Sequence, residues 1–258
     1  MKNMDNKTES VSLIILGTVQ DAGSPHIGCA KICCKDLFSN PDHNRKVVSI
    51  GIIDKINSKT FLFDATPDIT SQLQNLETHS GSISKIVPDG IFLTHAHIGH
   101  YTGLMYLGRE AMNSKNAEVY VMPRMKNFLE SNSPWDQLVD MKNIRLNLLK
   151  NEICVELTDA IKVTPFLVPH RDEFSETVGY KIEGPSKKVL FIPDIDKWDK
   201  WERNIIREIE SVDYAFLDAT FYDENETGNS GMSEIPHPFI TESMDLFKNI
   251  PAEEKIKI

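Results

Sequence analysis

Three histidines lie within six residues of the chain, in the segment THAHIGH. His95 and His97 are two positions apart at the end of an apolar run, and an extended backbone directs alternate side chains to the same side. Both imidazoles can therefore bind one ion, and His100, at the start of a predicted helix, can reach a second ion beside it. Neutral imidazole is a ligand for Zn, Fe and Ni. The segment thus predicts a metal site.

Four other apolar runs end in a residue type that binds metals. They are TFLFD, TPFLVPH, VLFIPD and YAFLD, which end at Asp64, His170, Asp194 and Asp218. An apolar strand with such an ending places the side chain at the edge of the sheet, where α/β proteins build their sites. Each aspartate alone could instead cap a helix or form a turn. Taken together, the endings favour one shared site.

The spacing of apolar residues predicts the elements that position these side chains. Apolar runs bounded by turn residues predict strands at 11–17, 46–54, 59–68, 89–97, 117–123, 153–157, 161–170, 177–184, 188–194 and 214–220. Helical spacing predicts helices at 69–76 (capped by Asp68), 104–112, 123–132, 198–210 and 238–250. Strands come first and then alternate with helices in each half, which favours two packed sheets with helices outside. We expect one α/β domain over residues 1–258.

Composition limits the classes of partner. With 258 residues, 40% of them apolar, the chain can form a full core, and its net charge of −10 argues against a nucleic-acid groove. A small anionic substrate stays compatible, because a bound metal ion can dominate the local field. No apolar run approaches a membrane span, and the polar start MKNMDNKTES lacks the apolar centre of a signal peptide. We therefore expect a cytoplasmic protein that binds no membrane, although a removed leader would leave the same sequence.

Three of the four cysteines crowd into the segment GCAKICCKD, as Cys29, Cys33 and Cys34. This spacing suits a metal clip or reactive thiols better than a disulfide framework. Ordinary buried thiols in a reducing cell are the alternative interpretation.

The ordered motifs resemble those of a known superfamily. THAHIGH after FLFDATPD, followed by VPH and FIPD, is similar to the metallo-β-lactamase superfamily, whose usual motif is H-x-H-x-D-H. LGTVQDAGSPHIGC, the adjacent cysteines and PHPFITESM further resemble the branch with the pyrroloquinoline-quinone biosynthesis B proteins and the phosphonate-pathway cyclic phosphodiesterase. The resemblance implies an αββα sandwich of two mixed β-sheets with outer helices.

The same resemblance implies roles for individual residues. It implies one metal ion held by His95, His97 and His170, and a second held by His100 and Asp194. His237, in PHPF, corresponds to a histidine that contacts substrate or assists proton transfer, although a plain loop role is the alternative. Asp64 is expected to orient the histidine loop, and Asp218 to do the same on the other side.

The sequence departs from the family pattern at Gly99, where the family has an aspartate that binds the second ion. We hypothesise that Asp21, on the loop after the first strand, or with less support His26, replaces this ligand. The rival interpretation is a site with a single metal ion.

A second departure lies at the C-terminus, where the family's last strand and its histidine are missing from NIPAEEKIKI. In the phosphodiesterase branch, a histidine from that region also completes a structural zinc site with the cysteines. Cys29, Cys33 and Cys34 would then hold a zinc ion that needs a fourth ligand.

These observations favour a metal-dependent hydrolase of a phosphodiester or another small, anionic ester. The expected cofactor is one or two Zn ions, with Fe or Mn as alternatives. An iron-dependent oxidoreductase and a non-catalytic metal-binding protein are the competing hypotheses. The sequence leaves a homodimer open.

Overall fold

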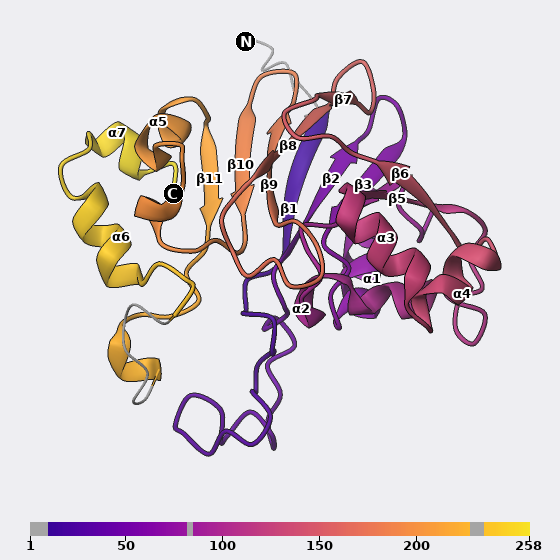
Figure 1. Cartoon of the computed structure of the whole chain (residues 1–258), viewed down its shortest axis with the longest axis horizontal. Coiled ribbons are helices and arrows are strands. Elements are labelled where there is room, and N and C mark those ends of the chain that lie inside the picture. Colours follow the sequence, from indigo (N-terminus) through magenta and orange to yellow (C-terminus); the bar gives the residue numbers. More distant parts are fainter. Residues whose placement is uncertain (1–9, 82–84, 228–234) are drawn as a thin grey trace, which may run out of the picture.

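The computed structural model describes residues 10–81, 85–227 and 235–258. Two β-sheets face each other, with α1, α3 and α4 outside the first sheet and α5, α6 and α7 outside the second (Figure 1). The predicted αββα sandwich of two mixed sheets is therefore confirmed. The polar N-terminal segment discussed above lies, up to residue 9, outside the described residues.

The first sheet has six strands, paired in chain order. They are β1 (Val11–Gly17), β2 (Ser49–Asp54), β3 (Lys59–Phe63), β4 (Gly90–Phe92), β5 (Ala117–Val121) and β6 (Ile144–Leu148). β2 is antiparallel to both β1 and β3, and the short turn at 55–58 folds β3 directly back on β2. From β3 to β6 the pairing is parallel, so these strands all end at the same edge.

The second sheet has the order β11-β10-β9-β8-β7. Its strands are β7 (Val155–Glu156), β8 (Lys162–Leu167), β9 (Val178–Glu183), β10 (Lys188–Ile192) and β11 (Tyr214–Leu217). Because β9 is antiparallel to both β8 and β10, those two strands run in the same direction. β11 is parallel to β10. The carboxyl ends of β8, β10 and β11 therefore meet at one edge, as parallel strands require.

Aromatic rings fill the space between the sheets and fix the strand that leads into the histidines. Phe63 stacks on Phe92 with ring centroids 4.9 Å apart, and Tyr180 meets Phe92 edge-on. The Tyr180 hydroxyl donates to the Leu93 carbonyl at 2.5 Å. This buried hydrogen bond joins the second sheet to the backbone just before Thr94 and His95, so the histidine loop has a rigid start.

The helices are α1 (Ile69–Ser80), α2 (Ile98–Tyr101), α3 (Pro123–Ser131), α4 (Trp135–Asp140), α5 (Ile205–Glu210), α6 (Ile240–Phe247) and α7 (Ala252–Lys255), with 3₁₀ turns η1 (Thr102–Leu107), η2 (Trp198–Lys200) and η3 (Glu224–Thr227). None in the described parts of the chain is long and apolar enough to cross a membrane. Spacing alone did not predict β6, α4 or α7.

Two predicted helices and one predicted cap differ from the structure. The helix expected at 104–112 is a 3₁₀ turn that ends at Leu107, and Met112 is exposed. The helix expected at 198–210 is interrupted at 201–204, because Asn204 caps α5 by accepting from the Ile206 amide. Asp68 does not cap α1; its carboxylate accepts from the Val47 amide at 2.8 Å instead. The side chains of Asn204 and Asp68 each accept a hydrogen bond from a backbone amide, and the spacing of apolar residues cannot predict such a bond.

The segment between β1 and β2 leaves the sandwich as a long arm built of turns (Figure 1). It closes on itself at its base, where the amides of Thr18 and Val19 both donate to the Lys46 carbonyl, at 3.0 and 2.9 Å. The cysteines lie on this arm, and Asp21 lies near its base. Near its base the arm lies beside the histidine loop, where Asp21 packs against Gly99.

Candidate metal centre

The strand directions bring the ligand-type residues to one edge of the sandwich. Each follows the carboxyl end of its strand: Asp64 after β3, His95 after β4, His170 after β8, Asp194 after β10 and Asp218 after β11. Side chains beyond parallel strand ends share one edge, which is where α/β proteins bind ligands. The five side chains thus lie at the edge where the strand endings had predicted a shared site.

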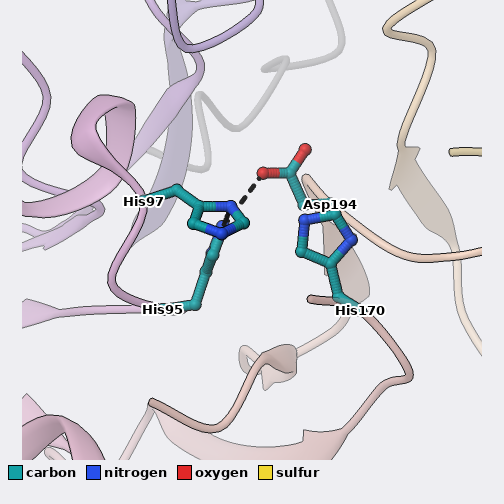
Figure 2. A group of neighbouring side chains, drawn as sticks. All are labelled: His95, His97, His170 and Asp194. Carbon is teal, nitrogen blue, oxygen red and sulfur yellow. Dashed lines mark hydrogen bonds and ion pairs between the residues drawn. The ribbon is translucent and has the colours of Figure 1, made fainter. Parts of the chain in front are cut away.

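Four of the predicted ligands form a cluster. His95, His97, His170 and Asp194 each place a ligand atom within 4.8 Å of those of the others. Figure 2 shows His95 and His97 on one side, facing Asp194 and His170 on the other. His95 Nε2 lies 3.1 Å from Asp194 Oδ2 and 2.9 Å from His97 Nδ1. Three imidazoles and one carboxylate are a donor set for Zn or Fe.

The hydrogen bonding of His170 tests whether this cluster fits a metal ion. Both of its ring nitrogens are buried, and neither has a hydrogen-bond partner among the described residues. Burial lowers the pKa of His170 from 6.5 to about 4, so the ring is neutral at physiological pH and keeps a lone pair for an ion. Buried polar atoms without partners are rare and costly in native proteins. A divalent cation at the cluster satisfies such a nitrogen, so the residues fit the metal.

His100 lies between two buried carboxylates. Its Nδ1 is 2.8 Å from Asp64 Oδ2, and its Nε2 is 2.9 Å from Asp194 Oδ2. Burial alone would lower the pKa of His100, but the charges of Asp64 and Asp194 raise it well above 6.5. Asp64 also accepts from the Thr94 amide at 2.8 Å, which connects it to the start of the histidine loop. This geometry supports the predicted orienting role of Asp64.

A second cluster adjoins the first and consists of Asp194, Asp218 and His237. His237 Nδ1 lies 2.7 Å from Asp218 Oδ2 and 3.8 Å from Asp194 Oδ1. Burial alone would lower the pKa of His237, but the hydrogen bond and charge of Asp218, together with the charge of Asp194, raise it above 6.5. Thr220 holds the other Asp218 oxygen at 2.7 Å. Asp218 therefore holds the His237 ring in one orientation beside the first cluster.

The two residues proposed to replace the missing aspartate lie in different places. His26 is exposed, and its Nδ1 is 2.8 Å from the Ile27 carbonyl oxygen. The backbone of Asp21 packs against Gly99, but its carboxylate belongs to neither cluster of described residues.

Glu173 is a neighbour of the site that the strand-ending pattern did not identify. Its Oε2 lies 3.2 Å from His97 Nε2. Glu173 is half exposed on the loop after His170, so it ends no apolar strand. Its position three residues after a candidate ligand was the only available signal, and an acidic loop residue is too common to single out.

The three clustered cysteines also lie together on the arm. Cys33 Sγ is 3.9 Å from Cys29 Sγ and 3.7 Å from Cys34 Sγ. Thiolates on one tetrahedral zinc ion, at about 2.3 Å from it, lie about 3.8 Å apart, so the spacing fits a zinc site. The backbone amide of His26 donates to the Cys34 thiol and lowers its pKa, which favours the metal-binding thiolate. Among the described residues, no other side chain completes this group.

Thiol reactivity tests zinc binding by the cysteines, with Cys154 as an internal control. Cys154 lies apart from the cluster and is exposed. With zinc bound, we expect it to react at once with a disulfide reagent, whereas Cys29, Cys33 and Cys34 react at least about tenfold more slowly. After treatment with a strong chelator, the slow phase should disappear. An unchanged time course after chelation, in protein that contained zinc, would contradict zinc binding here.

Comparison with known proteins agrees with the geometry of the site. A model of the beta-lactamase superfamily domain matches residues 59–258. The chain belongs to the β-lactamase superfamily. The matched range includes the THAHIGH segment and His170, as well as Asp194, Asp218 and His237. A comparison with curated proteins finds no match.

Solved structures of this superfamily share the fold over most of the chain. Zn²⁺-bound PqqB from Methylobacterium extorquens is 19% identical, with a TM-score of 0.74 over 93% of this chain and 85% of its own. A diphosphatase of the PhnP family is 20% identical, with a TM-score of 0.65 over 92% and 81%. Human tRNase Z, short form, is 16% identical, with a TM-score of 0.56 over 92% and 87%. The predicted likeness to PqqB-type and PhnP-type proteins is confirmed for the fold, whereas activity must be argued from the site.

Proposed function

We propose that this protein is a metal-dependent hydrolase of a small, anionic ester, with a phosphodiester as the leading substrate class. The observation that carries the proposal is the convergence of His95, His97, His170 and Asp194. Both nitrogens of His170 are buried and have no hydrogen-bond partner in the described part of the chain. Similar structures that are named as a diphosphatase and a tRNase support hydrolysis as the type of reaction.

The metal centre and its neighbours have separate tasks in this proposal. His95, His97, His170 and Asp194 would hold a divalent ion, which would supply Lewis-acid activation of water and of the attacked bond. Asp64 fixes the His100 ring by a hydrogen bond at Nδ1, 2.8 Å long, so the histidine loop keeps its position. The protein thus supplies a pre-oriented set of ligands, which avoids reorganisation during the reaction.

His237 is placed to transfer a proton. Asp218 binds its Nδ1 at 2.7 Å, which leaves Nε2 as the nitrogen that can face a substrate. Because Asp218 raises the pKa of His237, a larger fraction of the ring is protonated near neutral pH. We therefore assign His237 as the general acid for the leaving oxygen, and Asp218 as the residue that positions it.

A second candidate is an iron-dependent oxidoreductase. The first cluster contains three imidazoles and only one carboxylate, which also suits Fe(II). This candidate predicts oxygen consumption with Fe(II), and no ester turnover with Zn or Mn.

Elemental analysis followed by reconstitution distinguishes these functions. Chelator-treated protein is reloaded with Zn²⁺, Mn²⁺ or Fe²⁺ and assayed on bis(p-nitrophenyl) phosphate, a lactone, a thioester and a β-lactam, with oxygen uptake recorded in parallel. We expect turnover of the phosphodiester with Zn²⁺ or Mn²⁺. Oxygen uptake with Fe²⁺ alone would favour the oxidoreductase, and no turnover of any kind in metal-loaded protein would contradict both enzymatic functions.

A further inference from the structure

Gly99 cannot carry a side chain while the arm keeps its position. A Cβ built on Gly99 would lie 2.0 Å from Asp21 Cβ and 2.4 Å from Asp21 Cα. Non-bonded carbon atoms pack at about 3.5–4.0 Å, so both atoms are far inside contact distance. The contact involves the Asp21 backbone, which cannot move aside as a flexible side chain can. The glycine in THAHIGH is therefore required by the position of Asp21.

Asp21 occupies the volume that a side chain at position 99 would occupy. Two carbon positions 2.0 Å apart are separated by little more than one bond length, so the Asp21 side chain begins almost where a side chain on residue 99 would begin. Gly99 lies between His97 and His100, beside the metal ligands. A carboxylate attached at Asp21 thus starts from nearly the same point in space as one attached to α2.

A built turn holds Asp21 at this point. The Gly23 amide donates to the Gln20 carbonyl at 3.0 Å, which closes a turn over Asp21. The Gln20 side chain completes it, because its Oε1 accepts from the Ala22 amide at 2.8 Å and its Nε2 donates to the Gly23 carbonyl at 3.1 Å. These bonds occupy the backbone and the Gln20 amide, whereas no hydrogen bond or ion pair engages the Asp21 carboxylate among the described residues. The carboxylate is therefore free to turn toward a ligand.

The neighbouring ligands form an incomplete set. Asp21 lines the same cavity of about 930 Å³ as Asp194 and Asp218. His100 Nε2 is buried and lies 2.9 Å from Asp194 Oδ2. It forms no well-aligned hydrogen bond with any described residue. His100 is only 1% exposed. A buried nitrogen without a hydrogen-bond partner beside a carboxylate points to a cation as the intended partner.

We propose that Asp21 supplies a carboxylate ligand to a second divalent ion, which His100 and Asp194 also bind. The carboxylate lies outside the clusters in the structure, so binding involves rotation of the Asp21 side chain onto the ion. The ligand has in effect moved from α2 to the arm, and Gly99 makes room for it. The inference rests on the proposed metal centre and adds the residue that completes it.

Removal of the Asp21 carboxylate tests the inference. Mn²⁺ is the probe, because it prefers oxygen and nitrogen ligands and is a poor match for the cysteine thiolates. Bound Mn²⁺ is counted by electron paramagnetic resonance during titration of chelator-treated protein. We expect two ions per chain in the wild type and one in Asp21→Ala, with the affinity of the second ion at least about 100-fold lower. Asp21→Asn, which keeps the size of the side chain and removes its charge, should also lower the affinity of the second ion. Asp36→Ala, an exposed aspartate on the same arm, is the matched control and should keep both ions.

The outcomes separate this inference from the proposed function. Two ions in Asp21→Ala, or one ion in the wild type, would overturn the role of Asp21 and leave a hydrolytic metal centre intact. Wild-type affinity for both ions in Asp21→Asn would likewise overturn the role of the Asp21 carboxylate. A wild-type chain that binds no divalent ion at all would overturn the metal centre itself.

Discussion

Replacement of His170 by alanine is expected to remove the catalytic metal ion without loss of metal-free stability. Neither His170 nitrogen has a hydrogen-bond partner among the described residues, so the substitution removes no observed hydrogen bond, but it removes a ligand of the first cluster. A metal ion contributes several kcal/mol to the stabilisation of developing charge, so we expect hydrolysis to fall by at least about 10³-fold.

Three measurements check this prediction. Metal content per chain should fall in His170→Ala, phosphodiester turnover should fall with it, and the unfolding midpoint of the chelator-treated variant should equal or exceed that of the chelator-treated wild type. His79→Ala, an exposed histidine on α1, is the control and should change neither metal content nor rate. Wild-type metal content in His170→Ala would contradict its assignment as a ligand.

Replacement of Asp218 by asparagine is expected to slow catalysis while the metal ions remain bound. The substitution removes the charge that orients His237 and raises its pKa. General acid catalysis contributes about 10²–10⁴-fold, and we expect a loss of kcat within this range. Because the pKa of His237 falls in Asp218→Asn, protonated His237 is lost at a lower pH. The alkaline limb of the rate profile should therefore shift to lower pH.

The shift of the pH profile distinguishes positioning from a merely structural role. Asp223→Asn, at a half-buried aspartate after β11, is the control and should keep the wild-type profile. Loss of bound metal in Asp218→Asn would show that Asp218 is a ligand and would contradict the positioning role. An equal fall of kcat at all pH values, with no shift of the limb, would contradict proton transfer by His237.

Local rules pointed to the residues of the first cluster, but the family resemblance assigned them to ions and placed Asp194 with the second ion. The spacing of His95 and His97 follows from the alternation of side chains on an extended backbone, and His170 and Asp194 follow from apolar strands that end in a ligand type. Each of these signals lies within a few residues of sequence, and the parallel strand directions brought the separate ends to one edge. The two-sheet architecture was predictable for the same reason, because it depends on the order of strands and helices.

Contacts between distant segments decided the rest. Periodicity predicted a continuous helix at 198–210, but the Asn204 cap interrupts it. Likewise, Asp68 was a credible cap for α1 until the Val47 amide, 21 residues away, was seen to donate to it. In both cases a specific hydrogen bond overrides a weak local preference.

The sequence by itself predicted two packed sheets with outer helices and one shared site of histidines and aspartates, because strand periodicity and strand endings are local properties. The resemblance to the superfamily pattern marked Gly99 as the position of a missing ligand, but offered no reason for the glycine. Only the tertiary structure showed that Asp21 fills the space beside Gly99, and that Asp218 binds His237. The physical reason is the same for both pairs: residues 78 and 19 positions apart meet only after the sheets have packed.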